Sequence, residues 1–446
     1  MTAARPLDVA IAEALRLGAE DVEVSQASTT TEFVRFAHSR FTQVGESRHD
    51  LVRVRVLSGG RLGVALCASL QPEELRTAAA QALAIAERVP PLEVAIRFAS
   101  EGGPADPEPP PPIEGPDLGP EELRRAFDRS AGVAFFGALK RKRRHMAVRT
   151  AGGLARAHAD QVLQVDFIAQ VADGSGWAGW YGPTGRPVDL GGLAQRAADT
   201  ARRARDPLAL EPGKRDVVLA PAAVAELLEW MALASFGARS VLDGTSLLAG
   251  REGELLTSPR VTLSEAVGAG DVPFDSEGAA RQPVDFFRAG RAGRAVTDLV
   301  SAARLGGGRA TSGHAAPLTP QMDATDPVPS HLALQPGDRS EEELVGMVEH
   351  GVYVTRLHYV NGLLDTRRAT MTGMTRDGTF VIEGGRPGRA VRNLRFTDSI
   401  LDALGEERLG GIGREAACLP TWWSSAGQVE TPAVLVKGFH FTGTSR

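Results

Sequence analysis

Hydrophobic and polar residues follow patterns along the first part of the chain that predict helices and hairpins. Residues 6–18 carry apolar side chains at helical spacing and predict a helix. In LVRVRVL, at 51–57, apolar and basic residues alternate, which is typical of a strand with one solvated face. SGGR at 58–61 predicts a hairpin turn into the strand LGVALC at 62–67, and Pro72 then opens a further helix.

The order strand, glycine turn, strand and helix occurs twice in the N-terminal part. It is found at 51–87 and again at 162–204, where Asp189 stands in position to cap the second helix. We interpret this order as a weak internal repeat that makes two halves of one α+β domain. The proline-rich segment 104–120 predicts an extended linker or surface strap, because proline suits neither a helix interior nor a sheet ladder.

From about residue 216 the pattern changes to short strands and glycine turns. DVVLAP at 216–221 predicts a buried strand, and AELLEWMALASFG at 225–237 has the apolar stripe of an amphipathic helix. Strands are predicted for most of the segments after residue 237, including AVTDLVSAARLG at 295–306, and one more helix is predicted at 340–349. The second half of the chain is therefore expected to be rich in β-structure.

These patterns together predict an α+β fold of two domains. The N-terminal α+β domain spans 1–205. The β-rich C-terminal domain spans 206–446 and wraps a central helix over 222–236, which Gly237 ends. A chain of 446 residues is too long for one ordinary core, which agrees with more than one domain.

Charge and cysteine content narrow the cellular setting. A net charge of −5 gives no general attraction to nucleic acid or to an anionic membrane, and no apolar run is long enough to span a bilayer. The first residues lack the unbroken apolar core of a secretory signal, and Cys67 and Cys418 are too far apart in sequence to indicate a disulfide framework. We therefore expect a cytoplasmic protein that binds neither nucleic acid nor membrane.

Common metal-binding and nucleophile motifs are absent from the sequence. None of the nine histidines stands three, four or five residues from another, so neither HExxH nor HExxxH occurs. His350 and His358 flank a predicted helix end and a strand, and are interpreted as surface or cap residues. No GxSxG occurs, and neither Cys67 nor Cys418 has a histidine nearby in sequence, so both thiols are interpreted as structural.

The basic run KRKRR at 140–144 has three interpretations. It lies between a helix predicted at 120–136 and a strand predicted at 145–150. No aromatic residues interleave with it and the whole chain is acidic, so we interpret it as a solvated strand or loop end. Nucleic-acid binding and attraction of an acidic peptide stay as alternatives.

Two glycine-containing stretches also have a functional and a structural interpretation. LGGGR at 305–309 lacks the GK[ST] of a phosphate loop and predicts a turn. Asp275 and Glu277 in PFDSEG have the spacing to bind a cation or to act as a pair. Carboxylates in such a turn more often brace it by accepting hydrogen bonds from backbone N–H groups, and we expect that role here.

The order of the pieces from about residue 216 onward resembles the TldD/PmbA family. The similar stretches are DVVLAPAAVAELLEWMA, DGTSLLAGREGELLTSPRVTLSEA, VPFDSEGAARQPVDFFRAGRAGRAVTDLVSAARLG, LQPGDRSEEELVGMVEHGVYVT, MTGMTRDGTFVIEGGRPGRAVRNLRF and TPAVLVKGFHFTG. The N-terminal stretch EFVRFAHSRFTQVGESRHDLVRVRVLSGGRLGVA is also similar, so the resemblance covers nearly the whole chain.

The resemblance implies which branch of the family this chain is similar to. TldD-type chains carry HExxxH on the helix after the strand that corresponds to DVVLAP, where two histidines and a cysteine near the C-terminus hold zinc. The matching positions here are Glu229, Trp230 and Ala234, and Cys418 lies in the region of the zinc cysteine. Tryptophan cannot act as a general base, alanine cannot bind a metal, and one glutamate cannot hold zinc tightly. The chain therefore resembles the PmbA or TldE branch, with no catalytic, cofactor-binding or metal-binding residue of its own.

The resemblance also implies a function within a complex. It implies a heterodimer with a TldD-like zinc metallopeptidase that degrades or trims short or unfolded peptides, with the zinc in the partner. This chain would complete a chamber that takes extended peptides by strand addition. Two alternatives stay open: a self-sufficient homodimeric hydrolase that uses Asp275, Glu277 and a histidine, and a modulator that binds gyrase or nucleic acid through Lys140–Arg144.

Overall fold

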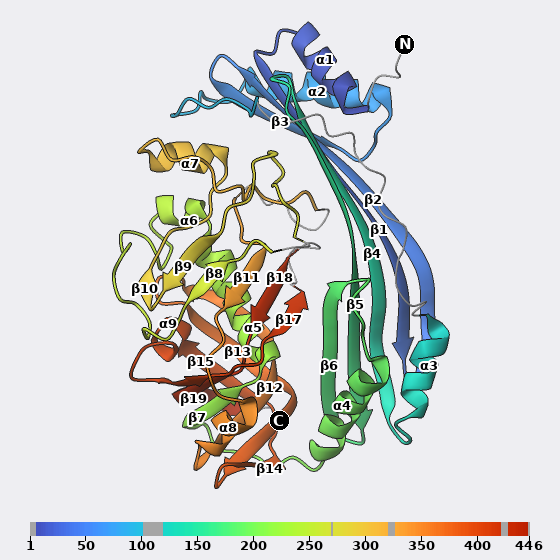
Figure 1. The fold of residues 1–446 in the computed structure, drawn as a ribbon, viewed down its shortest axis with the longest axis vertical. Helices are drawn as coiled ribbons and strands as arrows, with labels where there is room; N and C mark the ends of the chain where they lie inside the picture. Colours follow the sequence, from blue (N-terminus) through green and yellow to red (C-terminus); the bar gives the residue numbers. More distant parts are fainter. Residues whose placement is uncertain (1–5, 101–118, 269–270, 320–325, 421–426, 445–446) are drawn as a thin grey trace.

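A long antiparallel sheet forms a curved wall that runs the length of the molecule (Figure 1). The computed structural model describes residues 6–100, 119–268, 271–319, 326–420 and 427–444, so all but the end of the strap predicted at 104–120 lies outside the described residues. The elements of the wall are α1 (Pro6–Arg16), β1 (Asp21–Ala37), β2 (Arg40–Ser58), β3 (Arg61–Cys67), α2 (Pro72–Ala86), α3 (Pro120–Asp128), β4 (Ala134–Thr150), β5 (Ala155–Val171), β6 (Gly174–Pro183) and α4 (Leu190–Arg203). Its strand order is β3-β2-β1-β4-β5-β6, and each neighbouring pair is antiparallel.

The predicted internal repeat is confirmed by the structure. A helix, three strands and a second helix run from α1 to α2 and again from α3 to α4, and the two halves meet where β1 pairs with β4. A Cβ at Gly63 of β3 would lie 1.9 Å from the carbonyl oxygen of Ala82, and one at Gly176 of β6 would lie 2.2 Å from that of Ala197. These equivalent glycines allow the same close strand–helix packing twice. Asp189 caps α4 as predicted, by accepting a hydrogen bond from a first-turn N–H group.

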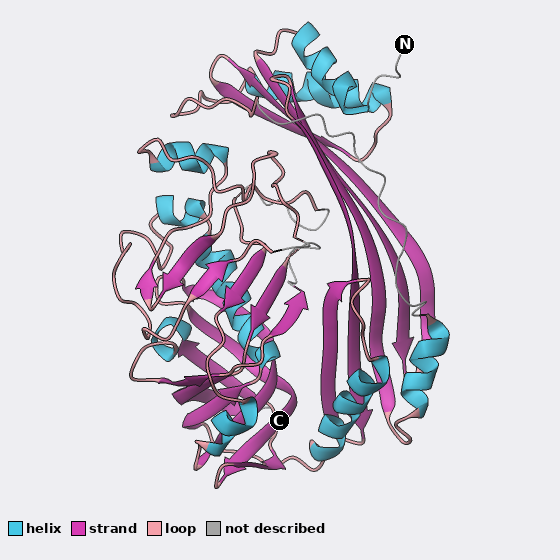
Figure 2. Cartoon of the chain, in the orientation of Figure 1, coloured by secondary structure: helices cyan, strands magenta, loops and turns pink. Residues whose placement is uncertain are grey.

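The two faces of the wall have different roles (Figure 2). Helices α1 and α2 cover one face at one end of the strands, and α3 and α4 cover the same face at the other end. Alternate side chains of β2 follow this division, because Val54 and Val56 are buried under α1 and α2 whereas Arg53 and Arg55 point to the opposite, concave face. The prediction that this basic face is solvated is wrong. The C-terminal half covers it, and Arg55 is only 5% exposed.

The basic run KRKRR lies inside the wall. The helix predicted at 120–136 ends with α3 at Asp128, and β4 begins at Ala134 and includes 140–144. The run lies on a strand and its side chains are partly exposed, but the predicted place at a strand or loop end is wrong, because 140–144 lie in the middle of β4, which pairs with β1 on one side and β5 on the other. The side chains of the run therefore alternate between the two faces of the wall, with Lys140, Lys142 and Arg144 on the concave face.

The C-terminal half builds a closed barrel and a second sheet on the concave side of the wall (Figure 1). Its elements are β7 (Gly213–Leu219), α5 (Pro221–Met231), the π-helical segment η1 (Ala232–Phe236), α6 (Ala238–Leu242), β8 (Leu263–Glu265), β9 (Val284–Arg288), β10 (Arg291–Ala292), α7 (Leu299–Leu305), β11 (His331–Leu334), α8 (Glu341–Gly346), β12 (His350–Asp365), β13 (Thr370–Glu383), β14 (Arg386–Ala390), β15 (Leu394–Ser399), α9 (Ile400–Ala403), β16 (Leu409–Ile412), β17 (Ala417–Pro420), β18 (Gln428–Thr431) and β19 (Val434–Thr444). The barrel runs β12-β7-β19-β15-β13 and closes because β13 also pairs with β12. The other sheet has the order β10-β9-β8-β11-β18-β17. The chain therefore has the predicted α+β fold with a β-rich C-terminal part.

Helix α5 is the predicted central helix. Its apolar stripe is buried in one core with side chains of both sheets, among them Val352 of the barrel and Val429 of the other sheet. The helix is shorter than the predicted 222–236, because it ends at Met231 and continues as the π-helical turn η1. Gly237 does not adopt the left-handed conformation expected of a helix-ending glycine, since its φ is −83°. Glycine is required there because a Cβ would lie 2.3 Å from the carbonyl oxygen of Pro327.

One predicted strand is a helix. Residues 295–306 contain α7, where the Asp298 carboxylate accepts a hydrogen bond from the Ser301 N–H at 2.7 Å and the Ser301 hydroxyl accepts one from the Asp298 N–H at 3.1 Å. This reciprocal cap starts a helix that the β-branched residues before it obscure. The three glycines after α7, at 306–308, all have positive φ and form the turn predicted for LGGGR.

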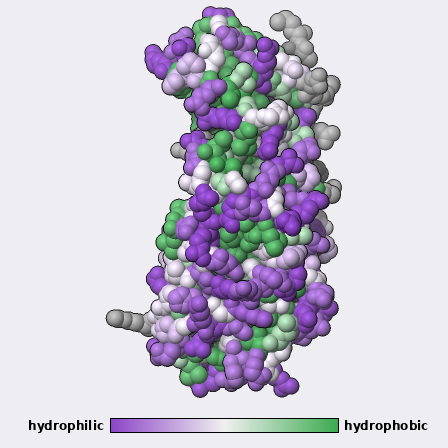
Figure 3. Space-filling model, turned by 90° about the vertical axis from the view of Figure 1, so that its left-hand side faces the viewer, coloured by the Kyte–Doolittle hydropathy of each residue, from purple (hydrophilic) through white to green (hydrophobic). Residues whose placement is uncertain are grey.

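Residues 204–212 connect the wall to the C-terminal half, and the boundary predicted at 205–206 falls within them. Helix α8 confirms the helix predicted at 340–349. Within the described ranges, no helix combines the length and the apolar composition needed to cross a membrane. Figure 3 shows hydrophobic residues on the outer side of the C-terminal half in separate patches that hydrophilic residues interrupt.

Candidate functional site

Helix α5 and η1 hold the positions at which the family resemblance places the zinc motif of TldD-type chains. Glu229 is 4% exposed, Trp230 is half-buried against Gly362 of β12, and Ala234 is half-buried in η1. Residues five apart lie about 140° apart around an α-helix, and a π-helical turn with i→i+5 hydrogen bonds reduces this angle. Glu229 and Ala234 therefore lie closer to one face than they would in an unbroken α-helix.

Cys418 lies on β17 and points away from the core that contains α5. Because β17 pairs with β18, Cys418 is opposite Glu430 and Leu419 is opposite Val429. Leu419 and Val429 belong to the core around α5, so the alternation along both strands directs the Cys418 thiol to the other side. There the thiol donates a hydrogen bond to the side-chain oxygen of Gln428, with sulfur and oxygen 3.4 Å apart. Burial, together with the nearby Glu430 carboxylate, raises the pKa of the Cys418 thiol to about 12.

These residues do not fit a zinc ion. Protein zinc sites use converging histidine nitrogens, cysteine thiolates and carboxylates. The matched positions on α5 and η1 offer one carboxylate, an indole that can only donate a hydrogen bond, and a methyl group. Across the ranges that the structure covers, no group of three or more His, Cys, Asp or Glu side chains is arranged to hold a metal ion.

A row of cavities separates the concave face of the wall from the C-terminal half, and we call it the interdomain cleft. An upper cavity beside β3 measures about 430 Å³, a basic cavity beside it about 280 Å³, and a lower cavity beside β6 about 240 Å³. Leu51 and Leu318 line both the upper and the basic cavity. A small space of about 50 Å³ shares Thr29 with the basic cavity and Arg144 with the lower one. The shared lining residues show that the cavities adjoin one another along the cleft, which is the candidate functional site.

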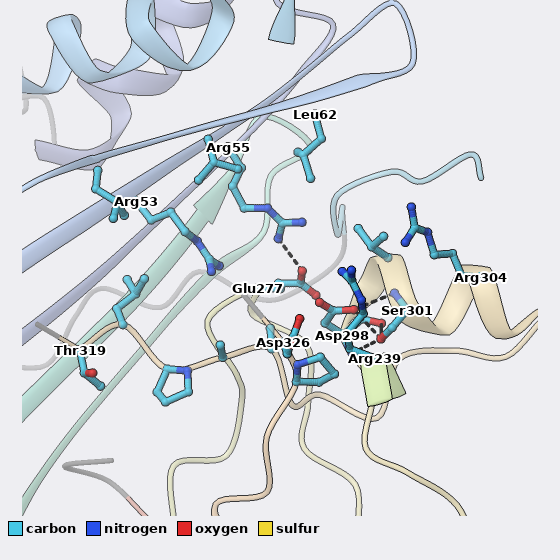
Figure 4. Close-up of a pocket in the computed structure, with 18 of the residues that line it drawn as sticks. Arg53, Arg55, Leu62, Arg239, Glu277, Asp298, Ser301, Arg304, Thr319 and Asp326 are labelled. Atoms are coloured by element: carbon cyan, nitrogen blue, oxygen red, sulfur yellow. Dashed lines mark hydrogen bonds and ion pairs between the residues drawn. The ribbon is translucent and has the colours of Figure 1, made fainter. Parts of the chain in front are cut away.

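The upper cavity is lined by charged side chains, among them Arg55 and Glu277, and by apolar side chains (Figure 4). Arg55 reaches from β2 across the cleft, and its guanidinium lies 2.5 Å from the Glu277 carboxylate. It also lies 3.1 Å from the carboxylate of Glu23 on β1. Arg53 donates a hydrogen bond to the backbone oxygen of Ser276 at 2.9 Å. The apolar walls come from Leu51, Leu62, Val64, Leu66, Leu242, Val300 and Leu318. This buried network joins the wall to the C-terminal half.

The PFDSEG turn is braced by its carboxylates, as predicted. One oxygen of Asp275 accepts hydrogen bonds from the N–H groups of Glu277 at 2.9 Å and Ala279 at 3.0 Å, and its other oxygen accepts one from Ala315 at 2.8 Å. Glu277 accepts a hydrogen bond from the Leu299 N–H at 2.8 Å, in addition to its pair with Arg55. Burial and the neighbouring Glu277 charge raise the pKa of Asp275 to about 7.

A hydrolytic centre built on these two carboxylates is not supported by the geometry. All of the oxygens of Asp275 and Glu277 are engaged by backbone N–H groups or by Arg55. The buried His314 serves another partner, because its Nε2 lies 3.0 Å from a carboxylate oxygen of Glu265. The hydrogen bonds hold both carboxylates in the turn, and among the described residues no histidine is paired with either of them as a hydrolytic centre would require.

The basic cavity is lined by the two lysines of KRKRR. Lys140 and Lys142 project onto the concave face with Arg35 of β1 and His49 of β2. The rest of the lining is formed by Ala27, Thr29, Thr31, Phe33, Ser47, Leu51 and Leu318. Leu318 belongs to the C-terminal half, so this basic surface faces the inside of the cleft.

The lower cavity gathers polar residues from distant parts of the sequence. His331 Nδ1 lies 2.7 Å from a carboxylate oxygen of Asp271, and the Gln428 amide nitrogen lies 2.9 Å from the other oxygen. Although burial opposes it, the contact with Asp271 raises the pKa of His331. Cys418 and Arg281 also line this cavity. Sequence reasoning missed this group, because its members lie on separate strands and loops without a common motif.

Sequence reasoning also missed most of the cleft residues of the wall. The alternation that predicted the strand over 51–57 places Arg53 and Arg55 on one face, and extending it backwards adds His49 and Ser47. The alternation identifies this face of the strand, but it does not indicate that the C-terminal half of the chain packs against it.

Family models match both the wall and the C-terminal half. The model of the PmbA/TldA metallopeptidase C-terminal domain matches residues 212–443, and that of PmbA/TldA metallopeptidase domain 1 matches residues 22–86. Among solved structures, TldE from Thermococcus kodakarensis is similar with a TM-score of 0.83 and 17% identity, over 98% of this chain and 100% of that chain. No curated protein matches the chain.

Two further solved structures share the fold. A candidate modulator of a DNA gyrase from Thermotoga maritima is similar with a TM-score of 0.79 and 20% identity, over 98% of this chain and 99% of that one. A candidate modulator of DNA gyrase from Bacteroides thetaiotaomicron is similar with a TM-score of 0.76 and 17% identity, over 98% of both chains. At these identities the similarity shows the fold alone.

Proposed function

The chain belongs to the PmbA/TldD family of metallopeptidases, and on that premise we propose that it is the non-catalytic, TldE-like subunit of a heterodimeric zinc metallopeptidase. The partner is a TldD-like chain that carries HExxxH and holds the zinc. The complex works in the cytoplasm on short or unfolded peptides. The choice of branch rests on the residues at positions 229, 230 and 234, and the chain shares its fold with TldE from Thermococcus kodakarensis.

One observation carries the proposal: the central helix keeps its place in the fold but lacks the chemistry of a zinc site. Zinc in a peptidase polarises the scissile carbonyl and activates a water molecule, and it needs several converging ligands and a nearby base. Glu229, Trp230 and Ala234 supply neither, and the Cys418 thiol is directed into the lower cavity. The helix is retained because its apolar stripe is the centre of the C-terminal core.

The remaining role of this chain is to shape the space in which the partner works. Its interdomain cleft is lined by one face of a long sheet, and extended peptides commonly bind to sheets through backbone hydrogen bonds. Recognition of backbone groups suits a peptidase with low side-chain specificity. The chain thus helps to enclose and align the peptide, and the partner cleaves it.

Nucleic-acid binding through KRKRR is not favoured as a second function. Three of the five basic residues in the run are ion-paired within the wall: Arg141 and Arg143 with Glu32, and Arg144 with Asp160. The two lysines line a cavity between the wall and the C-terminal half and do not form a continuous basic surface with the arginines of the run.

Reconstitution tests the proposal. The purified chain, a TldD-like chain that carries HExxxH, and an equimolar mixture are assayed for cleavage of an unstructured fluorogenic peptide and for complex formation by size-exclusion chromatography. We expect no cleavage by this chain alone and full activity from a heterodimer. Cys418→Ser should leave the zinc content of the heterodimer unchanged, as should the matched control Cys67→Ser. Cleavage by this chain alone, or a loss of zinc confined to Cys418→Ser, would contradict the proposal.

A further inference from the structure

The basic cavity carries positive charge without a partner. Lys140, Lys142, Arg35 and His49 line it, and its lining contains no carboxylate. In the described part of the chain, none of these four side chains forms an ion pair or a hydrogen bond. Lys140 and Lys142 are half-buried, and positive groups in such positions are normally paired, because desolvation disfavours an isolated charge.

The three arginines of the KRKRR run on the same strand are each paired with a carboxylate. On the opposite face, Arg141 and Arg143 each lie 3.2 Å from the Glu32 carboxylate. On the concave face, Arg144 lies 2.5 Å from Asp160. The neighbouring strands therefore supply a carboxylate to each arginine of the run and to neither lysine.

The two lysines are also unusual for this chain. Only four of its 50 Lys and Arg residues are lysine, and two of these four line the basic cavity. The other two, Lys214 and Lys437, are exposed on the barrel. A lysine places a compact charge on a flexible stem and can meet one oxygen from several directions, whereas arginine favours a fixed two-point partner.

The local field agrees with an excess of positive charge here. Burial and the nearby charges of Lys140 and Arg144 lower the pKa of Lys142 to about 8. Asp166 of β5 acts in the opposite direction and does not offset them. An anion in the cavity would relieve this repulsion and would raise the pKa of Lys142.

The cavity also contains neutral hydrogen-bonding groups and an apolar neighbour. Thr31 stands beside Lys142 in the pairing of β1 with β4 and beside Ser47 in the pairing of β1 with β2. The hydroxyls of Thr31 and Ser47 line the cavity and make no hydrogen bond among the described residues. The upper cavity, with its apolar walls, begins at the shared Leu51 and Leu318.

We propose that the basic cavity binds the side-chain carboxylate of an aspartate or glutamate in an extended peptide, and that a neighbouring apolar residue of that peptide enters the upper cavity. The choice of a peptide as ligand rests on the proposed function, whereas the anion site rests on Lys140 and Lys142 themselves. The basic cavity, of about 280 Å³, is large enough for an amino-acid side chain. The apolar walls of the adjoining upper cavity offer no favourable contacts to a charged sugar–phosphate backbone.

Paired peptides and paired variants test this site. The probes are acetyl-Leu-Glu-Glu-Leu-amide and its neutral analogue acetyl-Leu-Gln-Gln-Leu-amide, with binding to the full chain measured by calorimetry at low salt. We expect the acidic peptide to bind about tenfold more tightly than the neutral one. Lys140→Gln with Lys142→Gln should abolish that preference. The matched control, Lys214→Gln with Lys437→Gln, removes the same charge from the barrel and should keep it.

A second measurement does not depend on how the variants fold. Reductive methylation with ¹³C-formaldehyde labels the four lysines of the wild-type chain and leaves them charged, so each gives its own NMR signal. The acidic peptide should shift the signals of Lys140 and Lys142 and leave those of Lys214 and Lys437 in place. Shifts confined to Lys214 and Lys437, or no shift at saturating peptide, would overturn the proposal.

Two competitors separate the sources of the anion. Inorganic phosphate or a short single-stranded oligonucleotide that displaces the peptide at equal or lower concentration would overturn the assignment of a peptide carboxylate. Weak competition by both would support it. Zinc content and cleavage play no part in these measurements, so failure here would leave the proposed function standing. Failure of the proposed function would remove the reason for choosing a peptide but not the binding of an anion by Lys140 and Lys142.

Discussion

The upper cavity and the basic cavity lie next to each other on one face of one sheet, and both are lined by basic side chains. In the upper cavity Arg55 has two buried carboxylates as partners, one from the wall and one from the C-terminal half. In the basic cavity Lys140 and Lys142 have none among the described residues. The charge of Arg55 is therefore paired within the chain, whereas the charges of Lys140 and Lys142 can be paired by a negative group of a ligand.

This contrast separates structural charge from functional charge. A buried charge with its partner in the same chain stabilises the joint between two parts of a fold, and removing the partner is costly. A half-buried charge with no partner lowers stability slightly and is retained where it serves binding. Changes in the two cavities should therefore have different effects, which range from a large loss of stability to almost none.

Replacing Arg55 should have the largest effect. Arg55→Met leaves Glu23 and Glu277, which are 1% and 5% exposed, without their main cationic partner. We expect the free energy of unfolding to fall by about 3–5 kcal/mol, measured by urea denaturation. The control Arg35→Met removes an exposed arginine from the basic cavity and should change it by less than about 0.5 kcal/mol. Equal losses in both variants would remove the distinction between the cavities.

The stability of the upper joint should depend on pH. Burial and the Glu277 charge raise the pKa of Asp275 to about 7, so the folded chain holds a proton there that the unfolded chain releases. Stability from this group is fully present below its unfolded pKa and is lost as pH rises through about 7. Between pH 5.5 and pH 8 we expect a loss on the order of 1–2 kcal/mol. Asp275→Asn should reduce the dependence of the free energy of unfolding on pH, measured by urea denaturation. An unchanged pH dependence would show that another group is responsible.

Binding of the acidic peptide should weaken as pH rises. The pKa of Lys142 is lowered to about 8, so its ammonium loses charge above that pH, and a bound carboxylate opposes the loss. The dissociation constant measured by calorimetry should increase several-fold from pH 7 to pH 9, and at most about tenfold. In Lys142→Gln the increase should disappear. A dissociation constant that is independent of pH in the wild-type chain would argue against a role for Lys142 in binding.

The smallest effect concerns stability in the basic cavity. Because Lys140 and Lys142 have no partner in the described chain, changing both to Gln should alter the free energy of unfolding by less than about 0.5 kcal/mol, or should raise it slightly. The free energy of unfolding of the double variant is measured by urea denaturation and compared with that of Arg55→Met. A loss as large as that of Arg55→Met would mean that the lysines hold the fold together.

Local patterns of the sequence predicted much of the fold. Alternation and glycine turns identified the hairpins, and the repeated order in 51–87 and 162–204 corresponds to the two halves of the wall. The apolar stripe around Leu227 and Leu228 identified the central helix. These features depend on neighbours along the chain, which is why the sequence alone indicates them.

Two of the errors arise from contacts between distant parts of the chain, and one arises from a local cap that was not recognised. The basic face of 51–57 is buried because a part of the chain more than two hundred residues later supplies Glu277. The cap formed by Asp298 and Ser301 turns a predicted strand into α7. Gly237 was expected to end a helix by its conformation, but it is needed for its close approach to Pro327. Glu277 and Pro327 lie outside any local window of the sequence positions that they contact, whereas the cap of α7 is a local signal that the β-branched residues before it obscured.

The candidate site divides in the same way. The resemblance located Glu229, Trp230 and Ala234 on the central helix, and the structure places them there. It does not indicate the interdomain cleft, because the cleft lies between strands and loops that are distant in sequence. The lysines of KRKRR were noticed as a charged run, and only the sheet reveals that they share a cavity while their arginine neighbours are paired.

The most direct measurement for the central claim is the amount of zinc bound to the chain purified alone and without a histidine tag, determined by elemental mass spectrometry. We expect less than about a tenth of an equivalent per chain, because the positions on α5 and η1 offer a single carboxylate. A value near one equivalent would contradict this expectation. The chain would then hold a metal through other residues and would be a peptidase in its own right.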